Sequence, residues 1–122
     1  MPQRWTPGDR IAWMVRGFQL AFWCGLMLVV YLAVAKPMPG GPDDLLSIFD
    51  KATHVFVYAF FAILGLLGRQ RCSTVLVVLT LHGVSIEVMQ TFSPHRVGDW
   101  WDIAANSLGM LIVLLVAWIK KP

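Results

Sequence analysis

The sequence contains little charge for a chain of its length. Charged residues make up 14% of the 122 residues and hydrophobic residues 57%, whereas an average soluble domain is roughly a quarter charged. A water-soluble protein this small could not bury so much apolar surface in its own core. The composition therefore excludes an ordinary soluble domain and predicts an all-α integral membrane protein.

Cysteine and the common catalytic motifs are also scarce. The two cysteines are Cys24, inside the first apolar run, and Cys72, in a short loop, and these positions favour neither a disulfide nor a metal site. The sequence has no H-E-x-x-H motif, no glycine loop for phosphates and no nucleotide-binding motif. Its basic residues form short pairs beside apolar runs rather than one stripe. We therefore expect no cofactor, no metal and no nucleic-acid partner.

Four apolar runs predict a four-helix membrane bundle in a single domain over residues 1–122. The predicted spans are approximately 14–35, 50–68, 74–92 and 101–119, and a helix needs about 20 residues to cross a bilayer. The first run ends in a sequence that resembles a signal-peptide cleavage site, but its length favours a retained anchor. A short surface helix, capped by Asp43 or Asp44, is expected before the second span.

Small residues suggest where the predicted helices approach one another. Gly17, Ala21 and Gly25 lie four residues apart on one face of the first span, and Ala105 and Gly109 form a similar pair in the fourth. Such spacing lets a neighbouring helix come close.

The basic residues predict that both chain ends lie in the cytoplasm. With the N-terminus inside, the inner segments carry more Lys and Arg than the outer ones, as the positive-inside rule requires. The inner residues are Arg4, Arg10, Arg16, Arg69, Arg71, Lys120 and Lys121, and the outer ones are Lys36, Lys51 and Arg96. We therefore expect a multi-pass protein of the inner (plasma) membrane.

Polar residues gather near the outer ends of the second, third and fourth predicted spans. Asp50, His54 and Tyr58 recur every four residues and so share one helix face. Because lipid cannot satisfy polar groups, such faces turn towards each other or towards water. We therefore predict a polar pocket that opens to the outer side. Its predicted residues are Asp50, Lys51, His54, Tyr58, Glu87, Gln90, Arg96, Asp99, Asp102 and Asn106.

Several of these residues also have a purely structural interpretation. Asp50, Asp99 and Asp102 suit the starts of helices, where the helix dipole favours an anion. Asn106 could join neighbouring helices. Tyr58 suits a buried anchor with a satisfied hydroxyl.

Glu87 favours a functional interpretation more strongly than the other acidic residues do. It lies in the C-terminal half of its helix, where the dipole disfavours an anion. An acidic residue at the centre of a membrane helix costs roughly 2.5 to 3.5 kcal/mol. A salt bridge to His54, Lys51 or Arg96 is the structural alternative. His82 is expected in the bundle interior, outside this pocket.

Three blocks of the sequence resemble the VanZ-like family of small bacterial membrane proteins. They read Asp50-Lys51-x-x-His54-x-x-x-Tyr58, Glu87-x-x-Gln90 and Arg96-x-x-Asp99-x-x-Asp102-x-x-x-Asn106-x-x-Gly109. They share the family's order and spacing, and only together are they specific. Val55 departs from the aromatic residue that usually follows the histidine. The resemblance implies a cell-envelope protein. The founding member is linked to glycopeptide resistance of the teicoplanin type, while most relatives have no assigned chemistry.

The predicted pocket fits three kinds of function. It could bind a membrane lipid or a lipid-linked cell-wall precursor, with Lys51 and Arg96 on phosphate and Glu87, Gln90 and Asn106 on hydroxyls or amides. The alternatives are a membrane-embedded hydrolase that depends on a metal or on acid–base chemistry, and a proton-coupled small transporter. Four short helices would need a homo-oligomer for transport. Whether the chain is an enzyme stays open.

Overall fold

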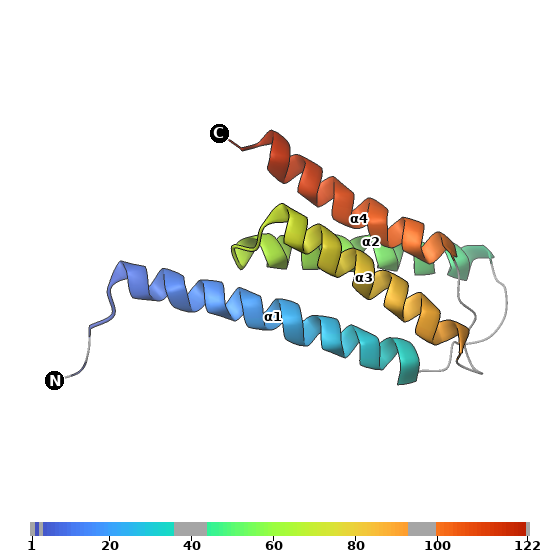
Figure 1. The fold of residues 1–122 in the computed structure, drawn as a ribbon, viewed down its shortest axis with the longest axis horizontal. Coiled ribbons are helices and arrows are strands. Elements are labelled where there is room, and N and C mark those ends of the chain that lie inside the picture. The colour runs from blue at the N-terminus through green and yellow to red at the C-terminus, as the bar shows by residue number, and fades with distance from the viewer. Residues whose placement is uncertain (1, 3, 36–43, 93–99, 122) are drawn as a thin grey trace.

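The computed structural model describes residues 2, 4–35, 44–92 and 100–121, and for residues 34–35 and 44–50 it describes the backbone alone. Four helices follow one another: α1 (Pro7–Ala35), α2 (Asp44–Leu67), α3 (Cys72–Thr91) and α4 (Trp100–Ile119). Consecutive helices run in opposite directions, so α1 begins and α4 ends at the same end of the bundle (Figure 1). The predicted all-α helical bundle is confirmed.

Helix α1 starts with a reciprocal cap. The Asp9 backbone N–H donates to Thr6 Oγ1 at 3.2 Å, and the Thr6 backbone N–H donates to Asp9 Oδ2 at 2.9 Å. Pro7 takes the first helical position, where a missing N–H costs no hydrogen bond. These local signals start the helix well before the predicted span begins.

Three helices are long and apolar enough to cross a membrane. They comprise Pro7–Ala33 in α1, Cys72–Thr91 in α3 and Trp100–Ile119 in α4. Large apolar side chains such as Leu20, Val77 and Leu115 are exposed around them, as expected for surfaces that face lipid. The chain is therefore a membrane protein. The described apolar stretch of α2, Lys51–Leu67, is shorter, so a fourth crossing stays a prediction.

Helix α2 is the central element, since it packs against each of the other three helices. Its closest partner is α4, because a Cβ added to Gly109 would lie only 2.0 Å from the Val55 carbonyl oxygen. Gly25 of α1 packs in the same way against the ring of Phe61. Gly17 has no neighbouring atom within 4 Å of an added Cβ, so its predicted part in a close helix contact is wrong.

The start of α2 differs from the sequence prediction in one respect. The helix begins at Asp44 and runs without a break to Leu67. The predicted short surface helix is therefore not a separate element but the first turns of α2. Its last residues and the second span share one continuous set of backbone hydrogen bonds, which leaves no joint at which the chain could turn along the surface.

Candidate functional site

Four polar side chains meet between α2 and α4 near the end where both helices begin. Lys51 Nζ donates to Asp102 Oδ1 in a salt bridge, and His54 Nε2 lies 3.6 Å from Asp102 Oδ2. His54 Nδ1 is hydrogen-bonded to Asn106 Oδ1 at 2.7 Å. We call Lys51, His54, Asp102 and Asn106 the polar cluster.

Helix periodicity and one close crossing build the polar cluster. Lys51 and His54 are three residues apart on α2, while Asp102 and Asn106 are four apart on α4, so each pair shares a helix face. The crossing at Gly109 brings α4 against α2 one turn deeper. Asp102 is 4% exposed, and it lies in the first turn of α4, where the helix dipole favours its negative charge.

Helix α3 closes the third side of this region. An added Cβ at Gly83 would lie 2.9 Å from Asn106 Nδ2 and 3.4 Å from the Tyr58 hydroxyl, so the missing side chain makes room for both polar groups. Glu87 is 5% exposed and lies one turn further along α3, on the Gly83 face. Because α3 and α4 are antiparallel, this register puts Glu87 at the level of Asp102.

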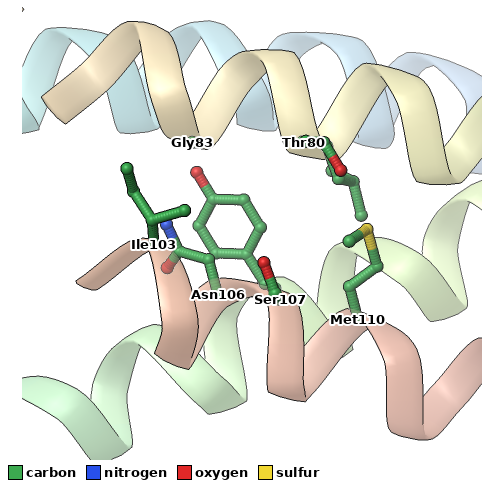
Figure 2. Close-up of a pocket in the computed structure, with 8 residues that line it drawn as sticks. Thr80, Gly83, Ile103, Asn106, Ser107 and Met110 are labelled. Carbon is green, nitrogen blue, oxygen red and sulfur yellow. The ribbon is translucent and has the colours of Figure 1, made fainter. Parts of the chain in front are cut away.

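A small hollow lies beneath the polar cluster, between α3 and α4. Figure 2 shows Gly83 and Thr80 on α3 facing Asn106, Ser107 and Met110 on α4. The hollow holds about 10 Å³, roughly the space that one water molecule needs. It is too small for an organic ligand.

His82 makes contacts that the sequence did not indicate. Its Nε2 donates to the Leu26 carbonyl oxygen at 2.9 Å, and its Nδ1 is 2.7 Å from the Tyr58 hydroxyl. The residue thus links α1, α2 and α3. The predicted interior position of His82 is consistent with these contacts. Its partners depend on how α1 docks, which helix periodicity does not specify.

A larger cavity of about 310 Å³ lies between α1, α2 and α3. Its apolar walls come from Val29, Leu32, Ala33, Val57 and Ile86. Its polar lining comes from Thr53, His54, Tyr58 and Gln90. We call this the α1 cavity. His54 belongs to both the polar cluster and the α1 cavity, so the two lie side by side.

Gln90 faces α1 rather than α4. Its Nε2 donates to the Ala33 carbonyl oxygen at 3.3 Å. The sequence predicted one pocket that contains both Gln90 and Asp102, whereas in the structure Gln90 lines the α1 cavity. The first helix had no part in the predicted pocket, and its wall of the cavity was therefore missed.

The structure places seven of the ten predicted site residues. It brings Lys51, His54, Asp102 and Asn106 into contact, with Tyr58, Glu87 and Gln90 on adjoining surfaces. Arg96 and Asp99 lie outside the described residues, as does the side chain of Asp50. Among the described residues, no group of three or more His, Cys, Asp and Glu side chains could hold a metal ion.

Comparison with known proteins gives two matches. The model of the VanZ/LLP1 family matches residues 11–121. An uncharacterized protein of the fission yeast Schizosaccharomyces pombe is 32% identical over 97 residues, which cover 75% of this chain and 56% of the yeast protein. The chain thus spans just over half the length of that relative. No solved structure matches.

Proposed function

Because the chain belongs to the VanZ/LLP1 family, we propose that it is a membrane protein that binds the headgroup of a phosphate-bearing lipid at the polar cluster. Family membership alone names no ligand. The observation that carries the proposal is a lysine, a histidine, a carboxylate and an amide held together at one end of a bundle whose remaining surface is largely apolar.

The chemistry of the polar cluster fits a headgroup that carries both charge and hydroxyl groups. The Lys51 ammonium can donate to phosphate oxygens, and charge-assisted hydrogen bonds are the strong ones. The Asn106 amide and the Asp102 carboxylate can form hydrogen bonds with hydroxyl or amine groups. Lys51 is part-exposed while Asp102 is buried, so the cation is the member of the ion pair that an incoming anion reaches first.

The ligand we favour is a membrane phospholipid rather than a lipid-linked cell-wall precursor. One similar protein comes from a eukaryote, fission yeast. A ligand that occurs in bacterial and eukaryotic membranes alike suits such a distribution. A link to glycopeptide resistance would then be indirect. If such a link exists, expressing the protein in a susceptible bacterium should raise the teicoplanin concentration needed to inhibit growth. Unchanged sensitivity would contradict the link.

Lipid retention by the purified protein tests the main proposal. Native mass spectrometry would count phosphatidylglycerol bound to the wild type and to Lys51→Met, with Lys120→Met as the matched control. Lys120 is an exposed lysine at the opposite end of the bundle. We expect Lys51→Met to lower the apparent affinity about tenfold, since a hydrogen bond to a charged group contributes roughly 1.5 to 3 kcal/mol. Equal retention by all three proteins would contradict the proposal.

A second candidate function is acid–base catalysis by His54. An amide oxygen only accepts hydrogen bonds, so His54 Nδ1 donates to Asn106 Oδ1 and the other ring nitrogen faces Asp102. A ring held in this way could exchange a proton with a substrate only through Nε2, the nitrogen beside Asp102. Incubation with phospholipids and isoprenoid phosphates tests it. Release of product by the wild type but not by His54→Gln would support catalysis, and no turnover by either would contradict it.

A further inference from the structure

We infer that the α1 cavity holds one acyl chain of the bound phospholipid, so that the ligand is recognised by its chain as well as by its headgroup. The inference rests on the proposed function, because it places the apolar part of the same ligand. Its basis is a graded lining, a defined volume and two hydrogen bonds that hold α1 in place over the cavity.

The walls that α2 and α3 give to the α1 cavity become more apolar with depth. His54 and Gln90 lie nearer the polar end of the bundle, and the aliphatic Val57 and Ile86 lie about one turn deeper, where Tyr58 adds one polar group that is hydrogen-bonded to His82. The wall from α1 is apolar at both levels, at Ala33 and at Val29. A phospholipid has the same order of groups along its length. The cavity therefore matches an amphiphile whose headgroup end points towards the polar cluster.

The volume of the α1 cavity suits an organic chain rather than water. At about 310 Å³ it reaches the lower end of the range for ligand pockets, which is roughly 300 to 1,000 Å³. Its deeper walls are largely aliphatic, and an ordered water molecule needs two to four polar partners. Because the surrounding helices face membrane lipid, the hydrocarbon chains of lipids are the apolar groups in direct contact with the bundle.

Two hydrogen bonds hold α1 on either side of the cavity. The Leu26 carbonyl oxygen accepts from His82 Nε2 at 2.9 Å, and the Ala33 carbonyl oxygen accepts from Gln90 Nε2 at 3.3 Å. These carbonyls are seven residues, or about two turns, apart. Val29 and Leu32 lie between them and line the cavity. Helix α1 thus spans the cavity with a polar contact at each end, which keeps the cavity open.

Photo-crosslinking would locate the acyl chain of the lipid directly. The probe is phosphatidylglycerol that carries a photoreactive diazirine midway along one acyl chain, mixed into phosphatidylcholine vesicles with the wild-type protein. We expect crosslinked peptides to concentrate at Val29 and Val57, the half-buried aliphatic residues that α1 and α2 give to the lining. Crosslinks spread evenly over exposed residues such as Leu28 and Leu115 would show ordinary surrounding lipid and would overturn the inference.

A pair of neighbouring substitutions in α1 supplies the matched control. Val29→Phe fills the cavity, whereas Leu28→Phe enlarges a residue that is 56% exposed to lipid. We expect Val29→Phe to lower retention of dioleoyl phosphatidylglycerol at least about fivefold and Leu28→Phe to leave it unchanged. If Val29→Phe does not fold, as judged by gel filtration, Val57→Phe repeats the test from α2. Wild-type retention in a folded cavity variant would contradict the inference.

Soluble and isoprenoid competitors separate this inference from the proposed function. If the protein recognises the acyl chain, dioleoyl phosphatidylglycerol displaces the crosslinking probe and glycerol 3-phosphate does not. Equal displacement by both would leave headgroup binding intact and remove the chain site. Stronger displacement by an isoprenoid phosphate would overturn the assignment of an acyl chain. If Lys51→Met retains phosphatidylglycerol as well as the wild type does, the proposed headgroup binding fails, and the acyl-chain inference fails with it.

Discussion

Tyr58 and His82 illustrate how one buried polar pair joins three helices. A carbonyl oxygen only accepts hydrogen bonds, so His82 Nε2 donates to the Leu26 carbonyl oxygen. In a neutral ring, Nδ1 then accepts a hydrogen bond from the Tyr58 hydroxyl. In a bilayer there is no water to replace a lost partner. The pair therefore contributes to the docking of α1 on α2 and α3.

Removing the Tyr58 hydroxyl tests that contribution. Tyr58→Phe should lower the free energy of unfolding by about 0.6 to 1.7 kcal/mol, the size of interhelical hydrogen bonds in membrane proteins. The matched control is Tyr31→Phe, because Tyr31 is 66% exposed whereas Tyr58 is 2% exposed. Unfolding in mixed micelles with increasing dodecyl sulfate would measure both. Equal stability of the two variants would show that the buried bond contributes nothing.

The sequence predicted the members of the polar cluster better than their partners. Spacing alone indicated that His54 and Asn106 each lie on a polar helix face. Which side chains touch depends on the register between α2 and α4, and the crossing of Gly109 at Val55 sets that register. Neither Gln90 facing α1 nor His82 contacting Leu26 could be predicted, because both require knowing where α1 docks.

The turn between α2 and α3 carries a strained residue. After Leu67, the Gln70 N–H donates to the Gly65 carbonyl and the Arg69 N–H to the Leu66 carbonyl, the two bonds of a Schellman cap. The residue that this cap places in the left-handed region is Arg69, with φ of 60°. Glycine usually takes that position, since a side chain there costs roughly 1 to 2 kcal/mol.

Replacing that residue by glycine should stabilise the protein. We expect Arg69→Gly to raise the free energy of unfolding by up to about 1 kcal/mol, since relief of strain exceeds the added chain entropy. Arg69→Gln removes the same charge but keeps a side chain at the strained φ of 60°, and it should stabilise nothing. Dodecyl sulfate unfolding compares the two variants. An equal gain in Arg69→Gln, or a loss in Arg69→Gly, would contradict the strain argument.

The pairing of α2 with α4 depends on the missing side chain at Gly109. An added Cβ would overlap the Val55 carbonyl oxygen, a backbone atom that cannot rotate away. Gly109→Ala should therefore separate the helices and cost about 3 kcal/mol or more, at the upper end for overpacking. Gly17→Ala, where no atom lies nearby, should be harmless. Heat-induced aggregation followed by fluorescence-detected gel filtration would compare them, and equal behaviour would disprove the close crossing.

Helix positions were the most predictable part of the fold. The predicted spans 74–92 and 101–119 agree closely with α3 (Cys72–Thr91) and α4 (Trp100–Ile119). Apolar length determines both helices. Helix α1 begins earlier than its apolar run, at Pro7, because its cap extends the helix into polar sequence where hydrophobicity gives no signal. Helix α2 begins at Asp44 because the helix predicted before the second span is its first part.

Helix α1 is the most weakly integrated part of the whole molecule. It contacts α2 and α3, and among the described residues it makes no contact with α4. Among the side chains of α1 that the structure describes, only Phe22 and Leu26 are buried. Between the central α2–α4 pair and this outer helix lies the α1 cavity, so a ligand chain could enter without disturbing the polar cluster. In the binding mode proposed above, the headgroup would lie against the α2–α4 pair and the acyl chain against the more weakly packed α1.

The orientation of the bundle determines which side of the membrane the polar cluster faces. Because consecutive helices alternate in direction (Figure 1), α1 and α3 run the same way and α2 has to lead the chain back between them. Four such crossings put both chain ends on one side of the membrane. Helix α2 lies among three helices that are each apolar enough to span, which favours four. The excess of Lys and Arg near both ends of the chain favours the cytoplasm for them.

Labelling of single cysteines in intact cells tests this orientation. In a protein with Cys24→Ser and Cys72→Ser, we expect Trp5→Cys and Lys121→Cys to react with a membrane-impermeant maleimide only after permeabilisation. Phe92→Cys and Trp100→Cys, at exposed positions beside the polar cluster, should react without it. Opposite behaviour of Trp5→Cys and Lys121→Cys would contradict four crossings and the alternating order of the helices. Protection of Phe92→Cys and Trp100→Cys would place the polar cluster in the cytoplasm, where a headgroup from the inner leaflet, not the outer, would reach Lys51.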